Sequence, residues 1–114
     1  MDDIAVTNVG RHHRYESTVG CAPAGFTEYL DRDGQRIFYH TETDEAFAGR
    51  GLAGTLVTRA LADTRDNGMR IVALCPFVAG YVRKHHDFDD SIDPVTAAII
   101  SAVEEVVQDG DPAG

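Results

Sequence analysis

A glycine-rich segment at residues 49–54 has the residue types and spacing that suit binding of an anionic group. Its sequence is Gly-Arg-Gly-Leu-Ala-Gly, and an amphipathic pattern begins within it at Leu52. Glycines at a helix entrance leave backbone N–H groups accessible, and the helix N-terminus adds partial positive charge. The segment therefore predicts a phosphate or pyrophosphate site. The same six residues match the G-x-G-x-x-G pattern of dinucleotide-binding folds, so the surrounding elements must decide between ligands.

Four strands are predicted before this segment. Alternating or β-branched stretches occur at residues 4–9, 14–19, 26–30 and 36–42. Residues 20–23 form a turn region between the second and third strands, and residues 31–34 form another between the third and fourth. Gly34 can take a positive φ, so the third and fourth strands are expected to form a hairpin.

Helices alternate with one buried strand in the second half of the chain. One helical face is predicted after the glycine segment, formed by Leu52, Leu56, Val57, Ala60, Leu61 and Thr64. Asn67-Gly68 is expected to end this helix. Residues 70–75 are almost wholly apolar, as in a central strand covered on both faces, and Pro76 ends that run.

Two further helices are predicted beyond this strand. One covers residues 78–85, and the other follows Asp93 as N-cap and Pro94 at the first helical position. The apolar stripe of the last helix consists of Val95, Ala98, Ile99, Ala102, Val103 and Val106. The element order indicates an α/β (α+β) fold in which a mixed, mostly antiparallel sheet is flanked by helices.

Length and charge restrict the classes of function. A chain of 114 residues fits one compact domain, and its net charge of −9 makes nucleic acid a poor partner. The same charge would attract a cationic amine, although acidic surfaces also serve solubility. No apolar run approaches the roughly 20 residues that span a bilayer, which predicts no membrane insertion. The N-terminus is acidic where a signal peptide is basic, so a cytoplasmic location is expected.

Cysteine and histidine spacing predicts no metal site. Cys21 and Cys75 are expected to be free thiols, as is usual for two cysteines in a cytosolic chain. The histidines at 12–13 and 85–86 are adjacent in sequence, and such neighbours do not converge on one metal as i, i+4 pairs do.

The context of the glycine segment argues against a nucleotide fold. A dinucleotide site needs a strand that runs directly into the first glycine, but residues 44–48 intervene. It also needs a carboxylate about 20 residues on at the end of the next strand, which here ends at Cys75-Pro76. A P-loop would require a lysine after Gly54, where Thr55 stands.

The chain resembles the GCN5-related N-acetyltransferases in four stretches that occur in the same order, at residues 40–42, 49–53, 74–78 and 81–85. The resemblance is greatest to the small single-domain YjdJ-type subgroup. In the family's loop pattern, Arg/Gln-x-x-Gly-x-Gly/Ala, Gly51 and Ala53 fill the last two fixed positions, while Ala48 replaces the usual Arg or Gln. The resemblance covers roughly residues 4–90. It implies a GNAT-like acyltransferase domain at 1–90 and a C-terminal helical extension at 91–114 that packs on it.

The resemblance also implies acetyl-CoA as co-substrate, with its pantetheine arm between the strand ending near Glu42 and the strand ending at Cys75. Backbone N–H groups at that strand edge would polarise the thioester carbonyl. Arg83 and Lys84 are the candidates for contact with the nucleotide phosphates. The pyrophosphate would lie on Gly49, Arg50, Gly51, Leu52, Ala53, Gly54 and Thr55.

The acceptor implied by the resemblance is a small-molecule or peptide amine, attacked without a metal. Glu42 and His40 share one side-chain parity and are the candidate general bases. Cys75 is a candidate proton relay or transient nucleophile, or a lining residue of the acetyl pocket. Tyr81 resembles the tyrosine that protonates the departing thiolate in relatives, or packs in the core.

Two further alternatives stay open from the sequence. A CoA-binding module with little transfer activity is the second hypothesis, because Ala48 departs from the loop pattern and no base is unambiguous. The stripe on the last helix either closes the core or pairs with another chain, so a monomer or a weak homodimer is expected.

Overall fold

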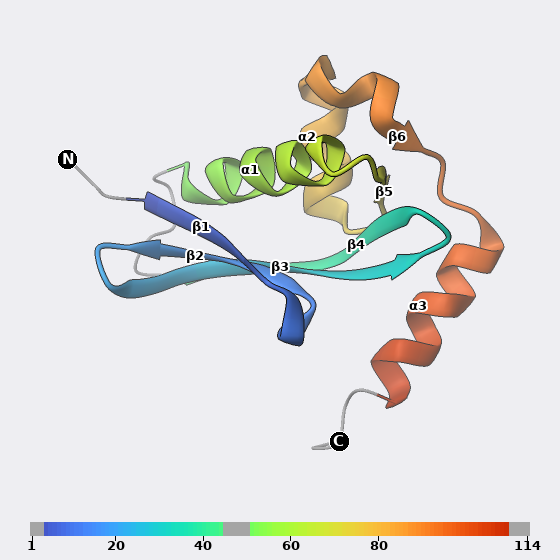
Figure 1. The fold of residues 1–114 in the computed structure, drawn as a ribbon, viewed down its shortest axis with the longest axis horizontal. Coiled ribbons are helices and arrows are strands. Elements are labelled where there is room, and N and C mark those ends of the chain that lie inside the picture. The colour runs from blue at the N-terminus through green and yellow to red at the C-terminus, as the bar shows by residue number, and fades with distance from the viewer. Residues whose placement is uncertain (1–3, 45–50, 110–114) are drawn as a thin grey trace.

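The computed structural model describes residues 4–44 and 51–109 and contains one six-stranded sheet in the order β1-β2-β3-β4-β5-β6 (Figure 1). The first four strands pair antiparallel, whereas β5 runs parallel to β4 and β6 parallel to β5. This arrangement confirms the mixed, mostly antiparallel sheet. The strands are β1 (Ile4–Val9), β2 (Arg14–Val19), β3 (Ala22–Arg32), β4 (Gln35–Thr43), β5 (Arg70–Ala73) and β6 (Ile92–Asp93).

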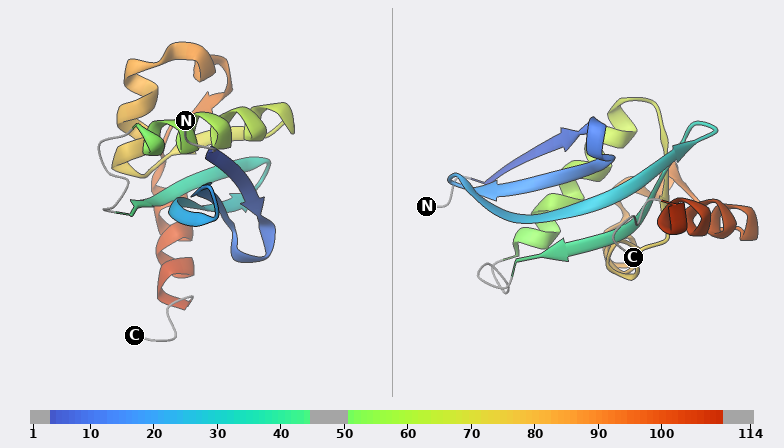
Figure 2. Two further views of the ribbon diagram at one scale, coloured as in Figure 1. Left: turned by 90° about the vertical axis from the view of Figure 1, so that its left-hand side faces the viewer. Right: turned by 90° about the horizontal axis from the view of Figure 1, so that it is seen from below.

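Three α-helices and two short 3-10 helices complete the described chain. They are α1 (Leu52–Asp66), α2 (Pro76–Lys84), α3 (Ala97–Asp109), η1 (Gly10–His12) and η3 (His86–Ser91). Helices α1 and α2 lie on one side of the sheet, and α3 extends on the other (Figure 2). None of the helices in these residues is long and apolar enough to cross a membrane.

The hairpin between β3 and β4 forms as expected. Asp33 and Gly34 both have positive φ, 53° and 77°. A two-residue turn of this kind matches the right-handed twist of the strands it joins. The turn between β2 and β3 is tighter than predicted, because Ala22 already pairs with Val19 at the start of β3.

Helix α1 packs its predicted face on the sheet. All six residues predicted for that face are buried, and α1 ends before Asn67-Gly68 as expected, with Gly68 at φ 75°. The helix face joins a core cluster with Tyr15, Phe38 and Ile71. Because residues from β2, β4 and β5 meet in this cluster, α1 is held in a fixed place above the central strands.

The second core lies on the opposite face and explains the apolar run of β5. Ile71 faces α1, whereas Val72 packs with Ile37 from β4 and with Ile99 and Val103 from α3. Strand β5 is therefore covered on both faces as predicted, although it ends at Ala73. The stripe predicted for the last helix is only partly buried, because Val106 is exposed and Val95, also exposed, precedes α3.

The predicted start of the last helix is wrong. Asp93 lies in β6, where it pairs with Val72, and α3 begins only at Ala97. The Asp93 carboxylate accepts hydrogen bonds from Gln35 (2.8 Å) and Arg70 (2.9 Å), which lower its pKa in that order of size. The local cap signal is thus overridden by strand pairing, and the Thr96 hydroxyl instead accepts the Ile99 N–H at 3.3 Å.

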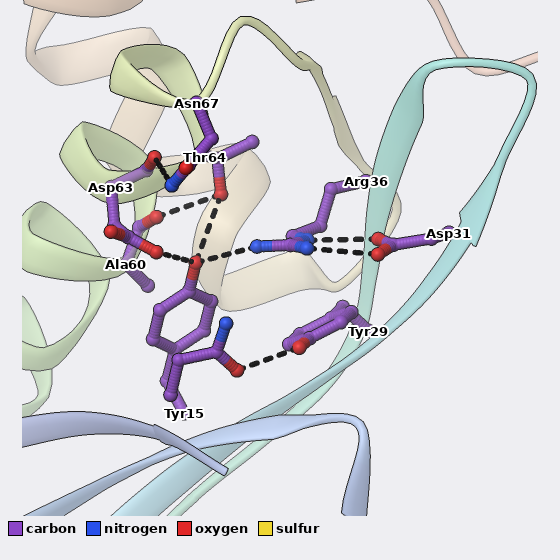
Figure 3. A network of polar contacts seen from close by, with 9 residues as sticks. Tyr15, Tyr29, Asp31, Arg36, Ala60, Asp63, Thr64 and Asn67 are labelled. Atoms are coloured by element: carbon purple, nitrogen blue, oxygen red, sulfur yellow. Dashed lines mark hydrogen bonds and ion pairs between the residues drawn. The ribbon is translucent and has the colours of Figure 1, made fainter. Parts of the chain in front are cut away.

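A buried polar network fastens α1 to the strands (Figure 3). Arg36 of β4 donates through Nε and Nη2 to the two oxygens of Asp31, each at 2.8 Å. Its Nη1 donates to the Tyr15 hydroxyl at 2.8 Å, and that hydroxyl donates to Asp63 of α1 at 2.6 Å. The guanidinium also lies 4.2 Å from the ring centre of Tyr29. Strands β2, β3 and β4 are thereby joined to α1.

Alkaline pH is expected to weaken the fold through Tyr15. Burial first, and then the hydrogen bond to Asp63, raises the pKa of Tyr15 from 10.0 to about 12. The folded state keeps this proton while the unfolded chain loses it, so the contribution is full below pH 10 and is lost as pH rises toward 12. Two pKa units correspond to about 2.7 kcal/mol. Urea unfolding from pH 9 to 12 should show this loss, and Tyr15→Phe should flatten it; parallel curves for the two proteins would contradict it.

Candidate functional site

Strands β4 and β5 separate halfway along β4. They pair only from Gln35 to Phe38, after which β5 ends while β4 continues to Thr43. The Phe38 carbonyl accepts the last bonds, from the N–H groups of Leu74 (3.1 Å) and Cys75 (2.8 Å). Beyond Phe38, β5 no longer pairs with β4, and this loss of pairing is called the β4–β5 gap below.

A bulge in β4 sets which backbone groups face this gap. Glu28 of β3 lies opposite His40, but Tyr29 lies opposite Phe38, so Tyr39 is an extra residue. Past the bulge, the Asp44 N–H bonds the Ala24 carbonyl at 2.7 Å. Antiparallel pairing alternates, so the main chain of Thr41 points away from β3. Its N–H and C=O therefore lie on the side that β5 has left.

Cys75 lies at the mouth of the gap. It is 5% exposed and is the N-cap residue of α2, with Pro76 at the first helical position. Helix α2 therefore begins two residues earlier than predicted, because the fixed φ of proline suits that position. The Cys75 Sγ donates to the Thr41 hydroxyl at 3.4 Å, and that hydroxyl is 2.9 Å from the hydroxyl of Thr27. The end of β4 and the thiol thus meet.

His40 and Glu42 form a hydrogen-bonded pair on the opposite side of β4 from this thiol. Their side chains meet at 2.7 Å between Nε2 and Oε2, so they share one face as predicted. Both are largely exposed, at 47% and 60%. Because side chains alternate along a strand, Thr41 points toward Cys75 while His40 and Glu42 point away. The two candidate bases and the thiol are therefore not in one cluster.

A hollow of about 350 Å³ lies at the N-terminal part of α1. Gly51 is the N-cap residue of α1 with φ 73°, a backbone conformation that favours glycine. No acidic side chain lies in the first turn of α1. The lining residues are Gly51, Gly54, Thr55, Thr58, Arg59, Tyr81 and His85.

The predicted cofactor-binding residues divide into three groups in the structure. Gly51, Gly54 and Thr55 line the hollow, whereas the Leu52 side chain is buried and leaves only its backbone for a ligand; Ala53 is half-buried beside them. Gly49 and Arg50 lie outside the described residues. Arg83 and Lys84 are exposed at the end of α2 and do not line the hollow.

Sequence reasoning missed three lining residues, which are Thr58, Arg59 and His85. Thr58 and Arg59 lie one turn beyond Gly54 and Thr55, so helical spacing from Gly51 was a signal that would have found them. Tyr81 is oriented by two of the three: its hydroxyl bonds the Thr58 hydroxyl, and its ring stacks on that of His85 at 4.4 Å between centroids.

A second cavity of about 360 Å³ lies where β2, β3 and β4 meet near Glu42. Carboxylates of Glu16, Glu42 and Asp44 line it, together with the ring of Phe26. The Arg14 guanidinium lies 4.5 Å from the centre of that ring and bonds Glu16 at 2.6 Å. Within the described ranges, no group of three or more histidine, cysteine, aspartate or glutamate residues is placed to hold a metal ion.

The chain belongs to the GCN5-related N-acetyltransferase family. The family model described as GCN5-related N-acetyl-transferase matches residues 14–91, well over half of the chain. The match begins at β2 and ends at η3, so it includes the β4–β5 gap, the hollow and Cys75. A comparison with curated proteins finds no significant match.

Proposed function

We propose that the chain is an acetyl-CoA-dependent N-acetyltransferase that transfers the acetyl group to an amine by direct attack. The observation that carries the proposal is the presence of both the hollow on α1 and the β4–β5 gap. The hollow at the α1 N-terminus offers backbone N–H groups, and the end of β4 offers the Thr41 main chain, which points away from β3 and lies beyond the residues that pair with β5. An anionic head with an extended amide-containing arm fits this combination.

Different residues would bind the pyrophosphate and the pantetheine arm of acetyl-CoA. The backbone of Gly51 to Gly54 would hold the pyrophosphate, and the Thr41 main chain would bond the pantetheine amides in the gap. Acetyl-CoA would supply an activated thioester there, and Cys75 would line the pocket for its acetyl group. The buried Cys75 lines that end of the gap, and its bond to Thr41 keeps the thiol directed at β4. The Leu74-to-Val78 sequence supports assignment to the YjdJ-type subgroup.

The cavity beside Glu42 is the proposed acceptor site. Its carboxylates would attract a protonated amine to a chain of net charge −9. His40 in its neutral form would then accept the proton from the amine, and the Glu42 carboxylate hydrogen-bonded to its ring would stabilise the imidazolium that forms. Attack by the neutral amine forms the amide bond and breaks the thioester C–S bond. The departing thiolate would take a proton from water, because Tyr81, the donor implied by the resemblance, lines the hollow with its hydroxyl bonded to Thr58.

Calorimetric titration tests the cofactor assignment. Acetyl-CoA and CoA are expected to bind one site per chain, whereas NAD should not bind, because no carboxylate follows β5 to hold its ribose. Absence of binding by both CoA species would contradict the proposal. Tight binding of NAD would instead favour a dinucleotide site.

A CoA-binding module without transfer activity is the second candidate function. The observation that favours it is the separation of the His40–Glu42 pair from Cys75 on opposite faces of β4.

Cys75→Ala is the variant that tests a chemical role for the thiol. We expect it to keep acetyl-CoA binding and to lower turnover severalfold by enlarging the acetyl pocket. Complete loss of turnover with intact binding would instead show an essential thiol.

A further inference from the structure

The hollow has the shape of a groove between α1 and α2, and it is called the groove below. Its lining positions on α1 are spaced three and four residues apart from Gly51 to Arg59, so they share one side of the helix. On α2, Tyr81 and His85 are also four residues apart and face the same groove. Eight residues of helix cover about 12 Å, which is longer than a single phosphate needs. The groove therefore suits a ligand with two separated anionic groups.

The hydrogen bonds of the groove wall have a definite direction. The Thr58 hydroxyl donates its one hydrogen to the Gly54 carbonyl at 2.7 Å. Its oxygen is then the acceptor for the Tyr81 hydroxyl. With the phenol fixed in this way, the ring of His85 that stacks on it is held at the groove.

Arg59 and His85 are the two lining residues of the groove whose side chains can carry positive charge. Arg59 donates from Nη1 to the Ile4 carbonyl at 2.9 Å. A guanidinium has five N–H donors, so this contact leaves others for a ligand. Arginine binds phosphate with charge-assisted, often bidentate hydrogen bonds. Arg59 lies between one and two helical turns beyond Gly54 and about two turns beyond Gly51, so its donors are offset along α1 from the place of the pyrophosphate.

We infer that Arg59 and His85 bind a second phosphate of CoA, the 3′-phosphate on its ribose. The inference rests on the proposed function and adds a specificity: the chain distinguishes CoA from dephospho-CoA. It also replaces Arg83 and Lys84, the pair expected from the sequence, with residues that line the groove.

The test is calorimetric titration of the full chain with CoA and with dephospho-CoA. Wild type is expected to bind CoA about tenfold more tightly, as one charge-assisted contact would produce. Arg59→Gln should remove most of this preference and leave the affinity for dephospho-CoA unchanged. His85→Phe, which retains a ring to stack on Tyr81, should reduce the preference in part. Arg83→Gln and Lys84→Gln are the matched controls, which should retain it.

Each outcome decides between the assignments. Failure of wild type to bind either ligand would contradict the proposed function itself. Equal affinity for the two ligands in wild type, or a preference that survives Arg59→Gln, would overturn the inference while the proposed function stands. Loss of the preference in Arg83→Gln or Lys84→Gln instead would assign the phosphate to the end of α2. Circular dichroism of Arg59→Gln, and recovery of the preference in Arg59→Lys, separate ligand binding from misfolding.

Discussion

Replacing Gly54 by glutamate is expected to weaken CoA binding by about 100-fold, because placing like charges side by side costs several kcal/mol. Gly54 lies in the first turn of α1 and lines the hollow, and a Cβ added there meets no atom within 4 Å. The same change should raise the free energy of unfolding by about 1 kcal/mol, since glycine is a poor helix former and an acidic side chain suits the first turn. Binding and stability are thus expected to move in opposite directions.

Gly54→Gln is the matched control for this prediction. Glutamine has nearly the size of glutamate without its charge, so it should stabilise α1 and bind CoA much more tightly than Gly54→Glu does. Titration calorimetry and thermal unfolding measure the two quantities. Equal CoA affinity in the two variants would mean that no anionic group lies at the α1 N-terminus.

Arg36→Leu is expected to lower the free energy of unfolding by about 3 kcal/mol, because removing one partner leaves the others of a buried charged network unpaired. Arg36 is 8% exposed and makes three hydrogen bonds, two to Asp31 and one to the Tyr15 hydroxyl. These bonds raise the pKa of Arg36 further above its already high ordinary value, with the bond to Asp31 as the largest cause. Urea unfolding followed by circular dichroism measures the loss.

Arg70→Leu provides a control of the same kind at a more exposed ion pair. Arg70 pairs with Asp93 at 2.8 Å, but its side chain is 46% exposed. Solvent screens such a pair, so its removal should cost no more than about 1 kcal/mol. Losses of equal size in the two variants would contradict the structural role assigned to the Arg36 network.

The elements with repeated periodic patterns could be predicted from the sequence. The six residues of the α1 face recur at helical spacing over its whole length, and all are buried. A single cap signal was less reliable. Asp93 and Pro94 have the types that begin a helix, yet the Asp93 carboxylate is bound by Gln35 and Arg70 through the β6 pairing. That pairing depends on contacts distant in sequence, which local residue types do not encode.

The candidate site divides in the same way. Cys75, His40 and Glu42 were placed at the ends of β4 and β5 by their positions in the pattern. The bulge at Tyr39 was not predictable, because one extra residue leaves no mark on a short alternating stretch. His85 also escaped prediction, since only the packing of α2 against α1 brings it into one groove with Arg59, which helical spacing from Gly51 could have found.

Release of free CoA thiol from acetyl-CoA in the presence of amines tests the proposed acetyl transfer most directly. Polyamines, amino acids and lysine-containing peptides make up the panel, and the acetylated amine is identified by its mass. We expect at least one cationic amine to be acetylated, with thiol release that requires both substrates. If acetyl-CoA binds but no amine in the panel accelerates thiol release, N-acetyltransferase activity is contradicted and the chain acts as a CoA-binding module.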